Sequence, residues 1–267
     1  MCDLCTKHGD GAIWYKNAKN YANDLMSDLR RRQYIQNFLE STIGEGITGL
    51  GRLETIFGKK KRLPDRLVKA MVEKAKEEHF GQVVPIEDVR TIIEKATTVV
   101  RMPCACRWAA GKKEKRCCYS VSYSAETWHE GLDMGYFGKT ADEGFEIMAG
   151  AEALAQMESL EEEGAIHTIW TMITPFIGAI CNCTTHECLG LRTLAMKVGT
   201  LTRGEYVAQV NSALCNGCGF CEKACQFNAI SSQVRDCGDA VAMVIPERCF
   251  GCGLCRSHCP QKAIALI

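Results

Sequence analysis

The C-terminal part of the chain repeats one short cysteine pattern, and this repeat constrains the fold more than any other feature. Residues 215–230 read CNGCGFCEKACQFNAI, and residues 249–264, 34 positions later, read CFGCGLCRSHCPQKAI. Both copies space their cysteines as C-x2-C-x2-C-x3-C. Because the gaps within each copy are so short, a tight loop can bring the first three sulfurs of each copy together around one centre.

This spacing is typical of chains that hold iron–sulfur cubes, in which each of the four iron corners needs one thiolate. Three cysteines separated by two residues wrap one cube, and the fourth cysteine then points away toward a second cube. The repeat therefore predicts two [4Fe–4S] clusters with crossed ligation. We expect cluster I to use Cys215, Cys218, Cys221 and Cys259. We expect cluster II to use Cys249, Cys252, Cys255 and Cys225.

Two glycines stand among the cysteines of each copy. Gly217 and Gly219 in the first copy, and Gly251 and Gly253 in the second, permit backbone conformations that other residues resist. We expect these conformations to let amide N–H groups point at the sulfurs, where they stabilise negative charge and tune the potential.

Residues 204–267 resemble the bacterial-type 2[4Fe–4S] ferredoxins, and this resemblance implies a ferredoxin-like domain that carries low-potential electrons. A zinc-binding pair of loops is disfavoured, because zinc sites usually show two C-x2-C pairs with a spacer. The chain departs from the pattern after the fourth cysteine of the first copy, where Gln226 stands in place of the proline found as Pro260 in the second. Cys237, between the copies, is not expected to be a ligand.

The composition indicates where the chain works. It has 267 residues, 18 of them cysteine, and its 32 basic and 32 acidic residues give zero formal net charge. Zero net charge favours neither nucleic acid nor an anionic membrane as a partner. The N-terminus shows no basic-then-apolar leader, and the longest apolar stretch, residues 165–181, is too short and mixed to span a bilayer. We expect a cytoplasmic protein with reduced thiols, in which clustered cysteines indicate metal or redox chemistry.

Seven further cysteines fall in three groups between residues 104 and 188, and we predict a third centre held by a subset of them. They are Cys104, Cys106, Cys117, Cys118, Cys181, Cys183 and Cys188. Two C-x-C pairs each follow an apolar, strand-like stretch, so we expect them at strand ends where an α/β fold places its sites. Another iron–sulfur cluster is the leading interpretation; zinc, a reactive thiol or disulfide site, and ordinary buried cysteines are the alternatives. Arg107 is positioned to hydrogen-bond an anionic group there or to form a surface salt bridge.

The motifs PCxCR at residues 103–107 and ICNC at residues 180–183 precede the repeat. With the repeat, they resemble multi-cysteine ferredoxin-like proteins of anaerobes, over most of residues 85–267. The resemblance implies a redox function in anaerobic metabolism and supplies no substrate. Such relatives often show further cysteines after ICNC, whereas this chain has Thr184, Thr185 and His186 before Cys188.

The chain starts with a second, shorter pattern of soft ligands. Cys2, Cys5 and His8 form C-x2-C-x2-H. One interpretation is that these three residues complete a metal site; the other is an unliganded chain terminus.

The predicted fold class is α+β, in three parts: a mainly helical region over residues 1–84, a mixed α/β cysteine-rich domain over 85–203, and the ferredoxin-like domain over 204–267. Apolar periodicity predicts helices over residues 20–40, from Pro64 onward, and over 85–96, 142–163 and 188–198. The helix after Pro64 is expected to bury Leu67, Val68, Met71, Val72 and Ala75. Gly44 to Gly51 predict a break between helices. Residues 97–101, 165–170 and 176–181 are predicted strands.

Together these features predict an iron–sulfur electron-transfer protein, or a subunit of an anaerobic oxidoreductase. It would pass low-potential electrons between the two clusters and the third centre, and exchange them with a redox partner protein. One alternative is a redox enzyme whose substrate chemistry takes place at the cysteines of the middle domain. Another is a redox sensor or a metallocofactor assembly factor.

Overall fold

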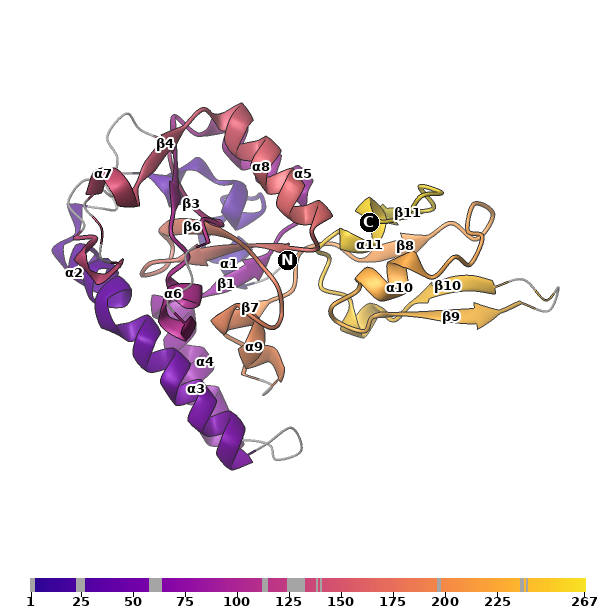
Figure 1. Ribbon diagram of the computed structural model, residues 1–267, viewed down its shortest axis with the longest axis horizontal. Coiled ribbons are helices and arrows are strands. Elements are labelled where there is room, and N and C mark those ends of the chain that lie inside the picture. Colours follow the sequence, from indigo (N-terminus) through magenta and orange to yellow (C-terminus); the bar gives the residue numbers. More distant parts are fainter. Residues whose placement is uncertain are drawn as a thin grey trace.

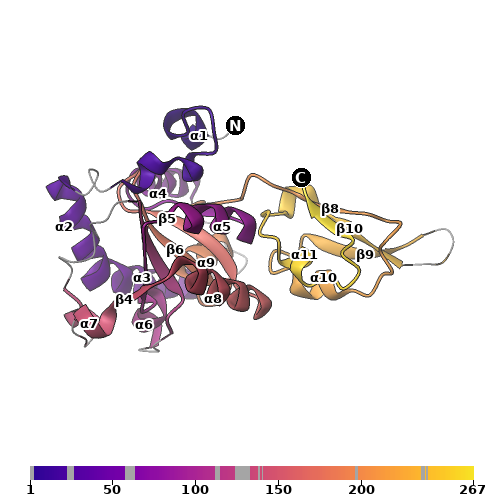
Figure 2. The same ribbon diagram turned by 90° about the horizontal axis from the view of Figure 1, so that it is seen from above.

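The computed structural model describes residues 3–22, 27–57, 64–111, 115–123, 133–137, 139, 141–195, 198–235, 238 and 240–267. It divides into a large body, residues 3–203, and a small C-terminal module, residues 204–267, that lies beside it (Figures 1 and 2). Within the described ranges, no helix has the length and apolar character needed to cross a membrane.

One seven-stranded sheet, in the order β4-β2-β3-β6-β5-β1-β7, organises the body. Its strands are β1 Gly81–Val83, β2 Thr98–Met102, β3 Cys118–Ser122, β4 Glu146–Met148, β5 Ile166–Thr171, β6 Ile177–Cys183 and β7 Leu201–Thr202. Neighbouring strands are antiparallel except β1 and β7. The body is therefore α+β, and its cysteines lie across neighbouring antiparallel strands. The cysteines do lie at strand ends as expected, because Cys104 follows β2, Cys118 begins β3 and Cys183 ends β6. These strands are antiparallel, however, and not the parallel strands of an α/β sheet.

Helices α5 (Ile86–Lys95) and α8 (Gly150–Glu162) pack on the first face of the sheet (Figure 1). The apolar residues of α5 recur at helical spacing, and its Ile92 and Val89 are fully buried against Met157 of α8 and Tyr119 of β3. None of the seven middle cysteines belongs to this core. Cys118 and Cys181 alternate with the core residues Tyr119 and Ile180 along β3 and β6, so they face the opposite side of the sheet.

The predicted helix over residues 142–163 begins late. Residues 142–149 instead include the end of α7 (Ala141–Gly144) and strand β4, which pairs with β2. Ile147 is 71% exposed and Met148 is buried, which is the two-residue alternation of an edge strand. Ladder hydrogen bonds to β2 thus outweigh the helical tendency of this segment. Gly164, with φ of +94°, ends α8 as expected.

The predicted break at Gly44 to Gly51 is also wrong, because α3 (Ile43–Phe57) runs through all of these glycines. It continues α2 (Leu29–Asn37) through one π-helical segment, Phe38–Thr42. A Cβ on Gly46 would lie 3.1 Å from a methyl carbon of Leu189, so the glycine lets α3 approach α9 (Leu189–Ala195) closely. Tertiary packing here overrides the cost of about 1 kcal/mol that each helical glycine carries.

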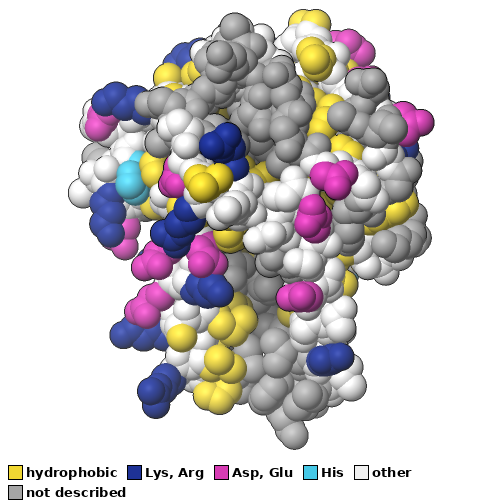
Figure 3. Space-filling view, turned by 90° about the vertical axis from the view of Figure 1, so that its left-hand side faces the viewer, with side chains coloured by type: hydrophobic (Ala, Val, Ile, Leu, Met, Phe, Trp, Pro, Cys, Tyr) yellow, Lys and Arg dark blue, Asp and Glu magenta, His cyan; other side chains and the backbone are white. Residues whose placement is uncertain are grey.

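Helix α4 (Asp65–Glu78) begins directly after Pro64, as predicted. Its apolar face is not buried: Leu67 is 46% exposed, and Met71, Val72 and Ala75 are only half-buried. The reason is that α3 and α4 form an arm that projects from the sheet (Figure 1). Hydrophobic side chains gather on this lower part of the molecule beside a column of charged ones (Figure 3).

The N-terminal segment covers one end of the sheet. It contains α1 (Asp3–His8) and two short 3-10 helices, Trp14–Lys16 and Ala18–Tyr21. The predicted helix over residues 20–40 is therefore not continuous: α2 starts at Leu29, where the Asp28 side chain accepts a hydrogen bond from the amide of Arg30. Leu25, part of that predicted helix, lies outside the described residues.

The segment is tied to the rest of the fold by one buried carboxylate, that of Asp88 on α5. Asp88 accepts hydrogen bonds from Tyr15 (2.6 Å) and Tyr206 (3.0 Å), and pairs with Lys16 at 2.5 Å. Because Tyr206 belongs to the C-terminal module, this carboxylate joins three parts of the chain.

Two short sheets and two short helices form the C-terminal module. β9 (Ile230–Val234) pairs with β10 (Ala240–Val244), and β8 (Ala208–Val210) pairs with β11 (Ile264–Leu266). The helices are α10 (Phe220–Ala224) and α11 (Leu254–Ser257), one from each copy of the repeat. The module thus has a doubled architecture that matches the two copies of its sequence repeat.

In the body, α6 (Ala105–Gly111) follows β2, and the 3-10 turn Gly135–Phe137 precedes α7.

Candidate functional site

The eight cysteines of the repeat line two separate small cavities. One cavity is lined by Cys215, Cys218, Cys221 and Cys259. The other is lined by Cys225, Cys249, Cys252 and Cys255. Each cavity takes three cysteines from one copy of the repeat and the fourth from the other copy, which is the grouping that crossed ligation requires. The donor set fits the group, because four thiolates around one cavity are what a [4Fe–4S] cube needs.

In each copy of the repeat, backbone amides donate hydrogen bonds to the sulfurs of the first and the fourth cysteine. Ala229 donates to Cys225 at 3.3 Å and Ala263 donates to Cys259 at 3.4 Å. The other two bonds cross the module: the amide of Ala242 reaches Cys215 at 3.5 Å, and that of Ala208 reaches Cys249 at 3.4 Å.

The sequence predicts such N–H groups beside the glycines, whereas the structure provides them from these four alanines. A signal was present, because residues 207–210 (VAQV) and 241–244 (VAMV) repeat at the same 34-residue interval. The four glycines do adopt positive φ, from +67° to +87°. Gly251 allows a close approach as well: a Cβ there would lie 2.4 Å from the carbonyl oxygen of Tyr206.

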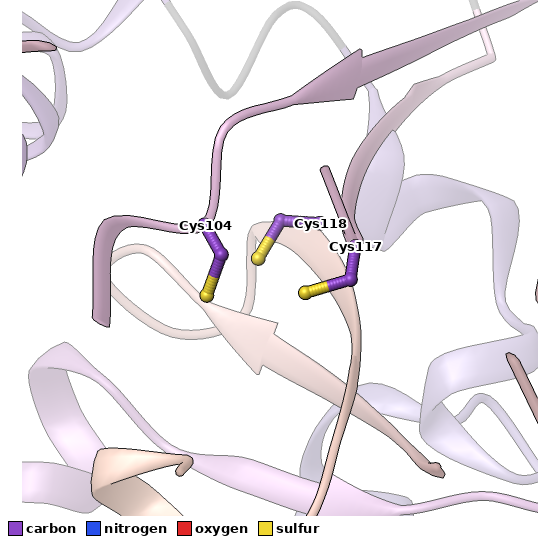
Figure 4. A group of neighbouring side chains, drawn as sticks. All are labelled: Cys104, Cys117 and Cys118. Carbon is purple, nitrogen blue, oxygen red and sulfur yellow. The ribbon is translucent and has the colours of Figure 1, made fainter. Parts of the chain in front are cut away.

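In the body, three sulfurs meet where β2 ends and β3 begins. Cys104, Cys117 and Cys118 are buried, and their sulfurs all lie within 4.8 Å of one another. The three side chains turn toward one another (Figure 4). Pairing of β2 with β3, and a hydrogen bond from the amide of Cys104 to the carbonyl of Lys115 (2.9 Å), bring the two segments together.

The other four cysteines of the middle groups adjoin these three. Cys181 on β6 is the register partner of Cys118 on β3, and Cys183 follows on the same face of β6. Cys188 packs with Cys183 in one hydrophobic cluster, and Cys106 packs beside Cys104. The structure therefore brings together all seven residues that the sequence grouped, which we call the cysteine site.

Contacts among these thiols shift their pKa values in opposite directions. Interactions with Cys106, Cys117 and Cys118 hold the pKa of Cys104 well below its ordinary value, whereas the interaction with Cys104 raises the pKa of Cys106. Cys188 lowers the pKa of Cys183. The arrangement therefore favours negative charge on some of the sulfurs, which is the form in which thiols bind metals.

Arg107 supplies a positive charge at this site. It is 8% exposed, its Nη2 lies 3.8 Å from the sulfur of Cys183, and it forms an ion pair with Glu187. Burial opposes its charged form, but the nearby Cys117, Cys183 and Glu187 raise the pKa of the guanidinium. Arg107 is therefore a buried partner of the sulfurs that also forms a salt bridge with the exposed Glu187.

A buried polar chain supports the loop before β3. The Asn182 side chain and amide both donate to the carbonyl of Cys117, at 2.9 and 3.0 Å. Nδ1 of His167 lies 2.6 Å from Oδ1 of Asn182, and its Nε2 lies 3.9 Å from a carboxylate oxygen of Glu161. These contacts hold Cys117 in position from the side of the sheet that α8 covers.

Gln226 connects the module to the cysteine site. Its side chain donates to the carbonyl of Gly164 and accepts from the amide of Thr185 at 2.8 Å. Proline, which holds the equivalent place in the second copy, could make neither bond. Gln226 follows Cys225, and Thr185 lies between Cys183 and Cys188, so one side chain links the two groups of cysteines.

Apolar packing also connects the module to the cysteine site. Cys252, Phe227 and Phe250 of the module pack against the hydrophobic cluster that contains Cys183 and Cys188. The rings of Phe227 and Phe250 stack with their centroids 4.2 Å apart. The cluster II cavity, which Cys252 and both phenylalanines line, therefore lies on the side of the module that faces the cysteine site.

The N-terminal C-x2-C-x2-H pattern is only partly described, because Cys2 lies outside the described residues. Cys5 is buried on α1, and its sulfur donates to a carboxylate oxygen of Glu205 at 3.6 Å. His8 ends the same helix, and partial burial lowers the pKa of its imidazole. The structure thus places Cys5 against the segment that enters the module.

Comparisons with known proteins point to the module. The family described as "4Fe-4S dicluster domain" matches residues 214–263. This match supports two [4Fe–4S] clusters and an iron–sulfur electron-transfer role for the C-terminal part of the chain. It does not extend to the cysteine site.

Two curated relatives share only a short stretch with the chain. Small ribosomal subunit protein uS3c of Eucalyptus globulus subsp. globulus is 38% identical over 53 residues, which are 19% of this chain and 24% of that protein. The uS3c protein of Lactuca sativa is 34% identical over 53 residues, with the same coverage. The chain spans about a quarter of the length of these relatives, and their similarity assigns it no activity.

Proposed function

We propose that this chain is an iron–sulfur electron-transfer protein, or a subunit of an anaerobic oxidoreductase, in which the module and the cysteine site exchange low-potential electrons. Bound [4Fe–4S] clusters supply one-electron chemistry, and a cysteine-ligated centre in the body is the third redox site. The observation that carries the proposal is the meeting of the middle cysteines in one site, in which Cys183 and Cys188 belong to the hydrophobic cluster that the module packs against.

The proposed ligands follow the two cavities and the cysteine site. Cluster I uses Cys215, Cys218, Cys221 and Cys259, and cluster II uses Cys249, Cys252, Cys255 and Cys225. The third centre uses Cys104, Cys117 and Cys118 together with one or more of their four neighbours. Three buried sulfurs within 4.8 Å are too few for a complete cube, so Cys181, the register partner of Cys118, is the fourth ligand that the geometry favours.

The burial of the cysteines suggests the order in which the three centres lie between solvent and the body. Cys218 is exposed, whereas Cys249 and Cys255 are buried. Cluster I therefore lies nearer to solvent, and cluster II lies between it and the cysteine site. Leu214, which precedes the cysteines of the first copy, and Phe220, which lies between Cys218 and Cys221, are 52% and 54% exposed. We assign the docking of a redox partner protein to this apolar edge of the module.

Iron and acid-labile sulfide counts on anaerobically prepared protein test this function. We expect about twelve irons per chain, four for each of three clusters, and about eight in Cys104→Ala. Glu94, an exposed residue of α5, provides a control, because Glu94→Gln should keep the wild-type count. About eight irons in the wild-type protein would contradict a third cluster, and a protein without iron would contradict the whole proposal.

A specific observation favours a second candidate, a redox enzyme with substrate chemistry at the cysteine site. A cavity of about 510 Å³ opens onto Cys106, Cys118, Cys181 and Cys188. A plain electron carrier has no need of a cavity of this size beside a redox centre. The two candidates share the same clusters, and they differ in whether a small molecule binds there.

A further inference from the structure

The cavity lies between the α3–α4 arm and the cysteine-bearing face of the sheet. Its volume of about 510 Å³ is within the range of pockets that enclose small organic ligands. Ile43 and Gly46 of α3, and Met71 and Ala75 of α4, line the outer side. This explains why the apolar face of α4 is not packed against the sheet: the cavity lies between them.

One wall of the cavity is a stack of aromatic rings. The ring centroids of Tyr34 and Phe38 are 5.9 Å apart, those of Phe38 and His79 are 4.2 Å apart, and those of His79 and Trp170 are 4.8 Å apart. All four side chains line the cavity. A continuous row of rings offers stacking or edge contacts to another ring, which a purely aliphatic pocket does not offer.

Thioethers form much of the remaining wall. The methionines concerned are Met71, Met102, Met134 and Met172. Methionine side chains adapt their shape to a ligand, and their sulfurs make favourable contacts with aromatic rings. The aromatic wall and the thioether wall therefore favour the same kind of occupant.

The charges around the cavity cancel. Among the described lining residues, Lys74 and Glu78 carry charge, and they pair with each other at 3.8 Å. An anionic ligand would lose its hydration here without gaining a free counter-charge from these side chains. The cavity therefore favours a neutral molecule over an anion.

From these observations we propose that the cavity binds a neutral, mainly apolar aromatic small molecule and holds it against Cys106, Cys118, Cys181 and Cys188. Binding itself needs only the cavity. Its consequence for electron transfer rests on the proposed function, because the ligand then lies in contact with the proposed third centre.

Calorimetric titration of the anaerobic, cluster-containing protein with 2-naphthol tests the inference. 2-Naphthoate, which has the same rings and a negative charge, is the matched ligand control. We expect one 2-naphthol per chain, with 2-naphthoate at least tenfold weaker. Equal affinity for the two would contradict the neutral character of the site, and no binding of 2-naphthol would overturn the proposal.

Two substitutions on α4 locate the site. Ala75 lines the cavity and Ala70, on the same helix, is exposed and outside the lining. Ala75→Trp fills the cavity and should weaken 2-naphthol at least tenfold, whereas Ala70→Trp should leave the affinity unchanged. Met71→Trp provides a second filling variant if Ala75→Trp does not fold. Unchanged affinity in a folded filling variant would mean that the ligand binds elsewhere, which overturns the proposal.

The iron count separates this inference from the proposed function. A wild-type protein with about eight irons that still binds 2-naphthol in the cavity would remove the third cluster and keep the ligand site. A protein with about twelve irons and no binding sensitive to Ala75→Trp would keep the clusters and remove the ligand site.

Discussion

The module and the body hold their cysteines in two physically different ways. In the module, each cavity is built from loops in which cysteines are two or three residues apart and amides of the same repeat point at the sulfurs. In the body, Cys104, Cys118, Cys181 and Cys188 come from separate elements that only the sheet and its covering helices bring together. The comparison shows that local sequence can specify a cluster-binding loop, whereas a site built across strands depends on the whole fold.

The largest expected effect tests whether ligation in the module is crossed. Cys225→Ala combined with Cys252→Ala removes two ligands of cluster II alone and should cost about four irons per chain. Cys225→Ala combined with Cys221→Ala removes a ligand from each cluster and should cost about eight. Iron and sulfide analysis of the two double variants distinguishes the cases. The reverse result would mean that each copy of the repeat holds its own cube.

The next effect concerns the joint between the two regions. Asp88→Asn removes the charge that pairs with Lys16 and weakens the acceptor of Tyr15 and Tyr206. We expect the free energy of unfolding to fall by about 3 kcal/mol, measured by urea denaturation under anaerobic conditions. Tyr206→Phe loses one of these bonds and should cost about 1 kcal/mol. A loss in Asp88→Asn no larger than in Tyr206→Phe would show that the carboxylate does not join the regions.

A third test measures how the stability of the body depends on pH through the buried His79. Burial lowers the pKa of His79 to about 4, below the value of about 6.5 that the unfolded chain has. Between these values the unfolded state binds more protons, so stability is full above about pH 6.5 and falls as the pH decreases toward 4. From pH 7 to pH 5 we expect a loss of about 2 kcal/mol from this residue.

His79→Phe keeps a ring between Phe38 and Trp170 and removes the titrating group. Its urea midpoints, followed by tryptophan fluorescence, should depend less steeply on pH than those of the wild-type protein. Parallel pH profiles for the two proteins would assign the acid sensitivity to other groups.

The smallest effect concerns the contact between cluster II and the cysteine site. Gln226→Pro loses the bonds to Gly164 and Thr185 and should lower the stability of the module by about 1 kcal/mol. Its cluster content should not change, but rapid-mixing experiments should show slower electron transfer from the module to the third centre. Pro260→Gln, at the exposed equivalent position of the second copy, is the matched control and should behave as wild type. Equal rates in both variants would mean that electron transfer does not depend on this contact.

The repeat alone allowed the module to be predicted in detail. The grouping of the eight repeat cysteines and the positive φ of the glycines among them follow from spacing, because a short loop has few ways to point several sulfurs at one place. Helices with a clear apolar period, such as α5, were also predictable. The sequence also indicated which seven cysteines of the body belong together.

Long-range packing decided the rest. Glycines that ordinarily interrupt a helix became part of α3, because Gly46 admits the side chain of Leu189. Residues 146–148 became an edge strand because β2 was available to pair with them. The cavity under α4, the burial of Arg107 and the contacts of Gln226 involve residues that are far apart in the chain. No local pattern specifies such contacts, because their energy depends on which distant surfaces the completed fold brings together.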